Sequence, residues 1–76
     1  MESSILIKFG LRIRSLRKGR KLTQKQLGEI TGFHWNYIGM VERGVRDLRF
    51  TNVEVFARAF DMSLSELLTF EVQDEN

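Results

Sequence analysis

Residues 22–44, LTQKQLGEITGFHWNYIGMVERG, have the pattern of two short amphipathic helices separated by a sharp turn. Thr23 and Gln26 have the spacing of a capping box, in which each side chain bonds to the backbone N–H of the other residue. The first helix is therefore predicted to begin at Gln24. Gly32 is suited to the left-handed backbone conformation that ends a helix, and a second helix is predicted to start two or three residues later.

The two predicted helices differ in the side chains that they leave on the surface. In the first, Leu27 and Ile30 lie three residues apart and are predicted to share the face that packs on the core. In the second, Ile38 and Val41 keep this apolar spacing, and Gly44 is placed to end the helix. The residues predicted to be exposed are Gln24, Lys25 and Glu29 on the first helix and Trp35, Asn36, Gly39, Met40 and Arg43 on the second.

Gly28 lies inside the first of these helices, where glycine costs about 1 kcal/mol relative to alanine. Two interpretations are open. Either a second helix crosses closely at Gly28 because no Cβ intervenes, or Gly28 is a tolerated surface glycine.

The rest of the chain repeats the helical spacing and shows no strand pattern. A first helix is predicted from Ser3 or Ser4 to about Lys18, and a fourth helix capped by Thr51 or Asn52. A second capping box, formed by Ser63 and Glu66, opens a fifth helix that extends to about residue 70. The predicted core residues are Ile5, Phe9, Ile13 and Leu16 in the first helix and Val53, Phe56, Ala57 and Phe60 in the fourth, with Lys8, Arg12 and Arg14 facing outward. The loop before the fourth helix is predicted to be anchored by Leu48 and Phe50, and residues 72–76 form a frayed tail.

The composition limits the classes of protein to which the chain can belong. Its 76 residues are enough for one domain with a thin core. The chain has no cysteine and one histidine, so neither a metal site nor a cofactor is predicted. No apolar stretch approaches the length of a membrane span, and the N-terminus lacks the pattern of a signal peptide, so a cytoplasmic protein is expected.

Charge is unevenly distributed along the chain. Residues 1–49 contain 11 Lys and Arg and four acidic residues, a net charge of +7, whereas residues 50–76 contain one Arg and six acidic residues, a net charge of −5. Such a local field attracts a polyanion to one end of the molecule and repels it from the other. The basic run from Arg12 to Lys21 taken alone is also consistent with a solvated surface.

Residues 22–44 resemble the helix-turn-helix of the lambda Cro/repressor (XRE-type) family. The resemblance extends upstream through FGLRIRSLRKGRKLTQ and downstream through VEVFARAFDMSLSELL, and the chain length and the run HWNYIGMVERGVRDL are most similar to controller proteins of restriction-modification systems. It implies an all-α, compact five-helix lambda-repressor-like DNA-binding domain, with its motif at about residues 23–43. The implied function is a sequence-specific transcriptional regulator of double-stranded DNA, with no enzymatic activity.

The resemblance also implies roles for individual residues, because in this family the second helix of the motif enters the major groove. Asn36 matches a base-reading position, and an asparagine can bond adenine through two hydrogen bonds. Glu42 matches a glutamate that forms an ion pair with an arginine of the first helix, here Arg17. The implied base-reading residues are Trp35, Asn36, Tyr37 and Met40, and the implied phosphate-binding residues are Gln24, His34, Arg43 and Arg46.

Several of these positions have a structural alternative or depart from the family pattern. Trp35 replaces a residue that is more often polar, and either packs on thymine methyls or sugars or covers the domain. Tyr37 either contacts DNA or packs, and His34 either caps the helix or lies near a phosphate. Asp47 replaces an asparagine, so either the loop turns its carboxylate away or DNA binding is weaker than in relatives.

One such domain covers half of a binding site, so a two-fold homodimer is predicted through about residues 51–70, with the two DNA-reading helices about 34–36 Å apart. The predicted interface residues are Phe60, Leu64, Leu67, Leu68 and Phe70. The alternative is a monomer whose fifth helix closes its own core. RNA polymerase is a further candidate partner.

Other functions remain open beside a controller protein. The same fold serves phage or plasmid repressors and antitoxin-like regulators. A protein-interaction module could instead use Trp35 and Met40 as an apolar face. An enzyme is poorly supported, because the chain has no glycine-rich phosphate loop and no nucleophile elbow.

Overall fold

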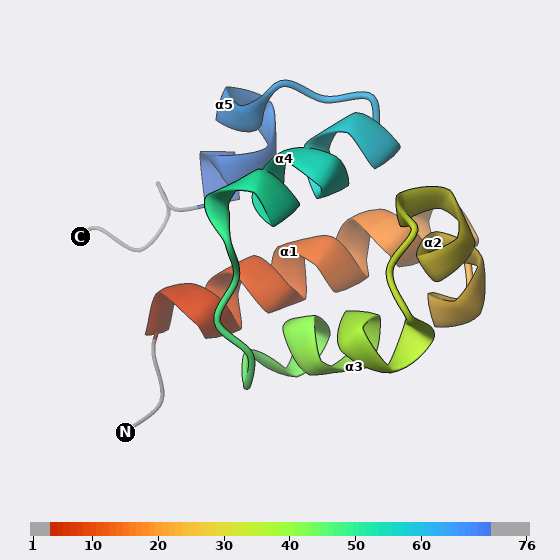
Figure 1. The fold of residues 1–76 in the computed structure, drawn as a ribbon. Coiled ribbons are helices and arrows are strands. Elements are labelled where there is room, and N and C mark those ends of the chain that lie inside the picture. The colour runs from red at the N-terminus through yellow and green to blue at the C-terminus, as the bar shows by residue number, and fades with distance from the viewer. Residues whose placement is uncertain (1–3, 71–76) are drawn as a thin grey trace.

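Five helices and no strands make up residues 4–70, the part of the chain that the computed structural model describes (Figure 1). The helices are α1 (Ser4–Gly19), α2 (Gln24–Thr31), α3 (Trp35–Arg43), α4 (Phe50–Ala59) and α5 (Leu64–Leu67), and a 3₁₀ turn over residues 68–70 follows α5. The all-α five-helix fold is thus confirmed. The predicted frayed tail, 72–76, lies outside the described residues. None of the described helices is long and apolar enough to cross a membrane.

Local sequence signals set most of the helix ends. Both predicted capping boxes are confirmed. The Gln26 N–H donates to Thr23 Oγ1 at 3.0 Å, and the Thr23 N–H donates to Gln26 Oε1 at 2.8 Å. The Glu66 N–H donates to Ser63 Oγ and the Ser63 N–H to Glu66 Oε1 in the same reciprocal way. Gly32 and Gly44 have φ values of +85° and +74°, so they end α2 and α3 in the predicted left-handed conformation.

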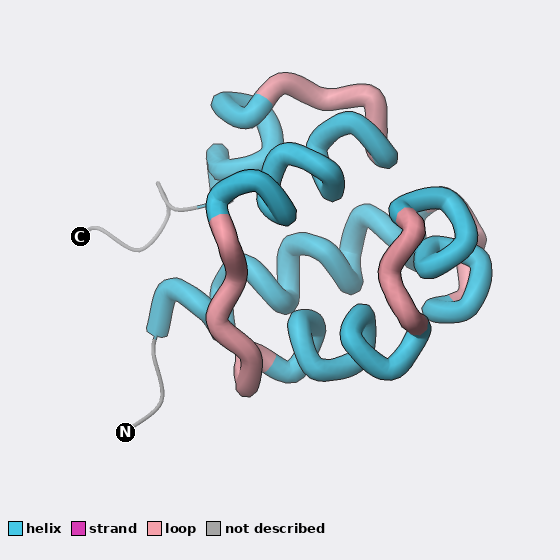
Figure 2. Tube along the Cα trace, in the orientation of Figure 1, coloured by secondary structure: helices cyan, strands magenta, loops and turns pink. Residues whose placement is uncertain are grey.

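The long helix α1 lies in the middle of the fold, with α3 on one side and α4 on the other (Figure 1). α2 packs across the end of α3, and α5 packs on α4. Short turns join the first three helices, and a longer loop runs from α3 to α4 (Figure 2). The core residues are Phe9, Ile13, Leu27, Ile38, Val41, Phe56, Ala57, Phe60 and Leu67. Every helix therefore contributes at least one side chain to a single core.

Several of the predicted burial assignments are wrong, and three of them concern Ile30, Ile5 and Gly39. Ile30 is 53% exposed, because α2 buries Leu27 and Gly28, and Ile30 lies on the side of Leu27 opposite to Gly28. Ile5 is 49% exposed, because it borders an open groove at the start of α1 instead of packing in the core. Gly39 is buried instead of exposed, and its surroundings are described with the site below.

The start of α4 also differs from the prediction. α4 begins at Phe50 with Arg49 as its N-cap, and the Arg49 side chain makes no capping hydrogen bond. Thr51 and Asn52 are therefore helical residues rather than caps. Phe50 does not anchor the loop, since 73% of its surface is exposed, whereas Leu48 packs against the core as predicted.

Two arginines, one in α1 and one in the turn that follows it, bind the C-terminal ends of other helices. The Arg12 guanidinium donates to the carbonyl oxygens of Leu67 at 3.0 Å and Glu66 at 2.8 Å. The Arg20 guanidinium donates to the Phe60 carbonyl at 2.7 Å and lies 5.0 Å from the centroid of the Phe60 ring. A cation at a helix C-terminus satisfies free carbonyl groups and the negative end of the dipole. Part of the basic run 12–21 therefore stabilises the fold, and the predicted outward orientation of Arg12 is wrong.

The predicted dimer interface is reduced by two residues. Phe60 is 1% exposed and Leu67 is 0% exposed, so both side chains belong to the core of the chain itself. Neither can offer surface to a second copy. Leu64, Leu68 and Phe70 are half-buried and remain candidates for the interface.

Candidate nucleic-acid interface

The turn between α2 and α3 rests directly on the backbone of α2. A Cβ atom on Gly28 would lie 2.6 Å from the Phe33 carbonyl oxygen and 3.4 Å from the Trp35 nitrogen. Of the two interpretations of Gly28, close approach of another segment is therefore confirmed. The segment that approaches is the turn together with the start of α3. The absence of a side chain at Gly28 allows the turn and the start of α3 to lie directly against α2.

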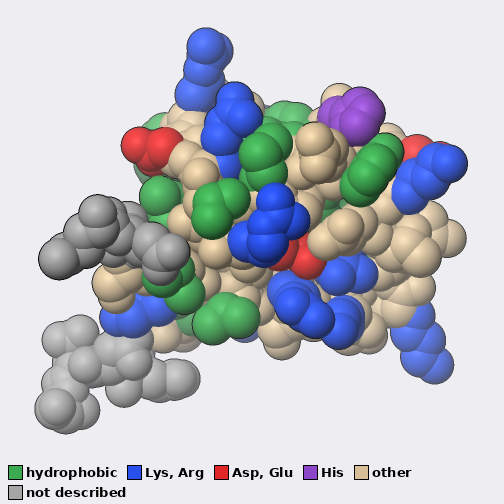
Figure 3. Space-filling model, turned by 90° about the horizontal axis from the view of Figure 1, so that it is seen from below, with side chains coloured by type: hydrophobic (Ala, Val, Ile, Leu, Met, Phe, Trp, Pro, Cys, Tyr) green, Lys and Arg blue, Asp and Glu red, His purple; other side chains and the backbone are tan. Residues whose placement is uncertain are grey.

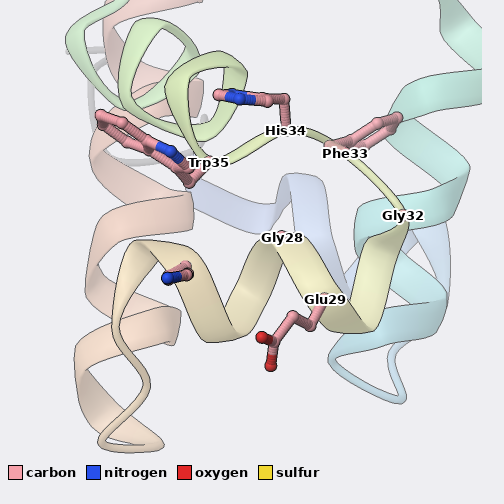
Figure 4. Close-up of a pocket in the computed structure, with 7 residues that line it drawn as sticks. Gly28, Glu29, Gly32, Phe33, His34 and Trp35 are labelled. Atoms are coloured by element: carbon pink, nitrogen blue, oxygen red, sulfur yellow. The ribbon is translucent and has the colours of Figure 1, made fainter.

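His34 is the N-cap of α3. Its Nδ1 atom accepts a hydrogen bond of 3.0 Å from the Asn36 N–H, so the predicted capping role is confirmed. The imidazole is stacked on the Trp35 indole, with ring centroids 5.6 Å apart and an angle of 30° between the planes. Figure 4 shows these two side chains together on one side of the turn, while Phe33 points the other way toward α4. A contact between His34 and a DNA phosphate stays a prediction.

The four predicted base-reading residues lie on or near the exposed face of α3, but only two are well exposed. Trp35 has 51% of its surface exposed, and Asn36 is exposed as well. Met40, one turn further along α3, is half-buried. Tyr37 is half-buried too, and its ring packs edge-on against Phe33 at 4.9 Å between centroids.

Tyr37 is held from two further sides. Its hydroxyl oxygen accepts a hydrogen bond of 3.1 Å from the Asn52 side-chain amide of α4. The Arg46 guanidinium lies over the ring, 5.6 Å from its centroid. The packing alternative for Tyr37 is therefore present in the structure, and this packing positions Arg46 beside α3. The role of Asn52 was not predicted, because the sequence pattern marked this residue only as a helix cap.

The predicted phosphate-binding residues differ in exposure and in the hydrogen bonds that they already make within the domain. Arg43 and Arg46 are exposed near the end of α3, and Lys and Arg side chains gather on the face that carries this helix (Figure 3). Gln24 is half-buried, and its amide donates to Glu42 Oε1 at 3.1 Å. As the first residue of α2, Gln24 still lies where free backbone N–H groups favour an anion.

The predicted ion pair between Arg17 and Glu42 is confirmed. Arg17 Nε lies 2.6 Å from Glu42 Oε2, and Arg17 Nη2 lies 3.0 Å from Glu42 Oε1, so the guanidinium and the carboxylate are joined by two hydrogen bonds. Both residues are buried, with 8% and 7% of their surfaces exposed. The remaining guanidinium nitrogen, Nη1, donates to the Leu22 carbonyl at 2.8 Å. This network joins α1, the start of α2 and α3, and it fixes the motif on the rest of the domain.

Gly39 is buried because the side chains of Arg43 and Gln24 lie close to it. A Cβ atom on Gly39 would lie 3.3 Å from Arg43 Nη1 and 3.6 Å from the amide nitrogen of Gln24. A glycine in mid-helix is costly and signals close packing, and this signal could have revealed its burial from the sequence.

Asp47 lies in the loop after α3 and is exposed. One of its carboxylate oxygens accepts a hydrogen bond of 2.9 Å from the Leu48 N–H. The loop's own backbone thus holds one oxygen of the carboxylate, and both interpretations of Asp47 stay predictions.

Comparisons with known proteins agree with this geometry. A helix-turn-helix family model matches residues 13–67. The chain is 42% identical over 57 residues to the control protein C.SmaI of Serratia marcescens, a match that covers 75% of this chain and 68% of that protein. It is 30% identical over 71 residues to the control protein C.BamHI of Bacillus amyloliquefaciens, with 92% and 88% covered.

The fold also matches that of a solved controller-protein structure. The crystal structure of the restriction-modification controller protein C.AhdI from Aeromonas hydrophila matches with a TM-score of 0.81 and 38% sequence identity, and the match covers 86% of this chain and 98% of that one. The chain belongs to the helix-turn-helix family of DNA-binding regulators and, within it, to the control proteins of restriction-modification systems.

Proposed function

We propose that the chain acts as a cytoplasmic homodimer that binds a pseudo-palindromic operator and controls transcription of a restriction-modification system. The observation that carries this proposal is the exposed face of α3, where Trp35 and Asn36 project from a helix that the buried Arg17–Glu42 pair fixes on α1. A rigid α3 with polar and aromatic side chains at its N-terminal end suits reading of bases in the major groove. No catalytic activity is proposed.

DNA binding with sequence preference is tested by mobility shifts. Selection from a random pool of duplexes should enrich a sequence with two related half-sites, because each protomer of the proposed dimer presents one α3. Failure of any sequence to be enriched over random DNA would contradict the proposal.

The neighbouring genes separate a controller protein from the alternatives. A restriction endonuclease and a methyltransferase are expected beside a controller protein, and other genes beside a phage or plasmid repressor or an antitoxin-like regulator. A requirement for direct contact with RNA polymerase is tested by transcription from the selected operator in a purified system.

Arg43 and Arg46 are proposed to contact DNA phosphates. Replacing either by alanine should reduce the slope of log K against log salt concentration by about 0.9 for each phosphate that the protein no longer neutralises. Arg58 is the matched control, since it is an exposed arginine on α4 with 79% of its side chain exposed. Arg58→Ala should leave the slope unchanged. An unchanged slope in the Arg43 and Arg46 variants would remove these residues from the set that binds phosphate.

The proposed dimer uses an apolar groove rather than the fully buried residues of α4 and α5. A groove of about 180 Å³ lies between the first turns of α1 and α4 and the end of the described chain, and it is bordered by Ile5, Phe50, Leu68 and Phe70. Phe50 is 73% exposed and Ile5 is 49% exposed. A second copy placed on this groove would cover both side chains, and burial of apolar area is the main driving force for such association.

Replacing Phe50 by glutamate should convert the dimer to a monomer. The monomer should remain folded, because Phe50 is the first residue of α4 and an acidic side chain in the first turn of a helix is favourable. Light scattering across micromolar concentrations measures the mass. Ile30→Glu, which changes another exposed apolar residue away from the groove, should stay dimeric. A monomeric mass for the unmodified chain would contradict the proposed dimer.

A further inference from the structure

Trp35 is an exposed aromatic residue at the start of the proposed DNA-reading helix. It is the first residue of α3, and 51% of its surface is exposed. It borders an open hollow of about 450 Å³ between α2 and the turn into α3, together with Lys25, Gly28 and His34 (Figure 4). Half-exposure means that the indole does not serve mainly as a cover for the core.

The Trp35 backbone lies against α2, and its ring is stacked on one neighbouring side chain. Its backbone rests on α2, where a Cβ on Gly28 would lie 3.6 Å from the Trp35 Cα atom. Its ring stacks on the imidazole of His34, which is itself fixed by the hydrogen bond from the Asn36 N–H. A large side chain that is already ordered loses little conformational entropy when it binds.

The chemistry of the indole matches one base edge better than the others. Its face is apolar, and its single N–H donates no hydrogen bond within residues 4–70. In the major groove, thymine presents a C5-methyl group beside the O4 acceptor, whereas cytosine presents an N4 donor. Guanine presents two acceptors, which a single N–H cannot satisfy together.

We propose that Trp35, backed by His34, is a specificity-determining residue that recognises thymine in each half-site through contact with the C5-methyl group and a hydrogen bond to O4. This inference rests on the proposed function, because it requires sequence-specific binding to the major groove. An arginine or glutamine at the same position could donate to O4 but offers no extended apolar face for the methyl group.

Modified bases test this recognition in the unmodified protein. In the DNA sequence selected from the random pool, each thymine of a half-site is replaced in turn by deoxyuridine, which removes the methyl group and keeps O4. At one position in each half-site, the substitution should weaken binding about fourfold, the effect of losing the burial of one methyl group. Replacement of that T·A pair by a 5-methylcytosine·G pair keeps the methyl group but replaces O4 by a donor, and it should weaken binding further. Because the base on the other strand changes as well, only the part of this loss that disappears in Trp35→Phe is assigned to the indole N–H.

Three variants assign the effect to Trp35. Trp35→Ala should bind thymine and deoxyuridine duplexes equally. Trp35→Phe should keep part of the preference for the methyl group but lose the discrimination against 5-methylcytosine that depends on the indole N–H. Ile30→Ala, the matched control with an exposed apolar residue on α2, should retain the full fourfold effect.

Two outcomes would overturn the inference. One is that no thymine is sensitive to removal of its methyl group, and the other is that Trp35→Ala shows the same sensitivity as the unmodified chain. Either result, obtained with a protein that still selects a defined sequence, leaves the proposed function intact. Failure to select any sequence would instead contradict the proposed function itself.

Discussion

Replacing Glu42 by alanine should lower the free energy of unfolding by about 3–5 kcal/mol, because it leaves the Arg17 guanidinium buried without its carboxylate. Arg17 is 8% exposed, so water cannot readily replace the two hydrogen bonds that Glu42 accepts at 2.6 and 3.0 Å. The Gln24 amide would also be deprived of its acceptor. A domain of this size has a total stability of roughly 4–11 kcal/mol, so the decrease is a large fraction of the whole.

The measurement is urea unfolding followed by far-ultraviolet circular dichroism at a fixed protomer concentration. Glu54→Ala provides the matched control, since Glu54 pairs with Arg58 at 3.4 Å on the surface of α4, where both side chains are more than half exposed. Exposed pairs of this kind contribute about 0–1 kcal/mol. If the free energy of unfolding decreased equally in Glu42→Ala and Glu54→Ala, breaking the buried Arg17–Glu42 pair would cost no more than breaking an exposed pair.

A double variant separates the value of the ion pair from the cost of breaking it. Arg17→Met combined with Glu42→Leu removes both charges and keeps apolar volume in the same place. Buried ion pairs can often be replaced by apolar residues at little cost, so the double variant should recover part of the stability that Glu42→Ala removes. Recovery is expected to be incomplete, because the Leu22 carbonyl no longer receives the hydrogen bond from Arg17.

The sequence predicts those parts of the fold that depend on local chemistry. The capping boxes at Thr23 and Ser63 and the left-handed glycines at 32 and 44 are specified by neighbouring residues alone, and the structure contains them where they were predicted. The start of α4 was predicted wrongly because its N-cap, Arg49, makes no side-chain capping hydrogen bond. A helix that begins without such a bond gives no local signal of its start.

The candidate site is less completely predictable, because several of its residues act through partners that are distant in the chain. The link between Asn52 and Tyr37 spans 15 residues, and in the fold that supports the site the arginines at 12 and 20 reach carbonyl groups 40 or more residues away. Periodicity identifies which face of a helix is apolar, but it does not identify which other helix covers that face or how far the cover extends. Ile5 and Ile30 fit the apolar pattern and are still about half exposed for this reason.

Replacing Gly10 by alanine is the second change expected to have a large effect, and periodicity gave no indication of it. Gly10 lies in α1 where this helix meets the end of α3, and it is buried. A Cβ atom there would lie 2.3 Å from the Val41 carbonyl oxygen and 2.6 Å from the Glu42 carbonyl oxygen. Both are backbone atoms, so no side-chain rotation can relieve the overlap.

Gly10→Ala should therefore destabilise the domain by roughly 3 kcal/mol or more, at or above the upper end of the usual cost of overpacking. The added methyl group must push α3 away from α1, and that movement also strains the Arg17–Glu42 pair, which joins the same two helices. Gly19→Ala is the matched control, because a Cβ atom on Gly19, the last residue of α1, would meet nothing within 4 Å. Alanine there should be neutral or should raise stability by up to about 1 kcal/mol. If thermal unfolding shows that the two alanine variants are equally stable, then α1 and α3 are not held in backbone contact, and the position of the DNA-reading helix must be fixed by side chains alone.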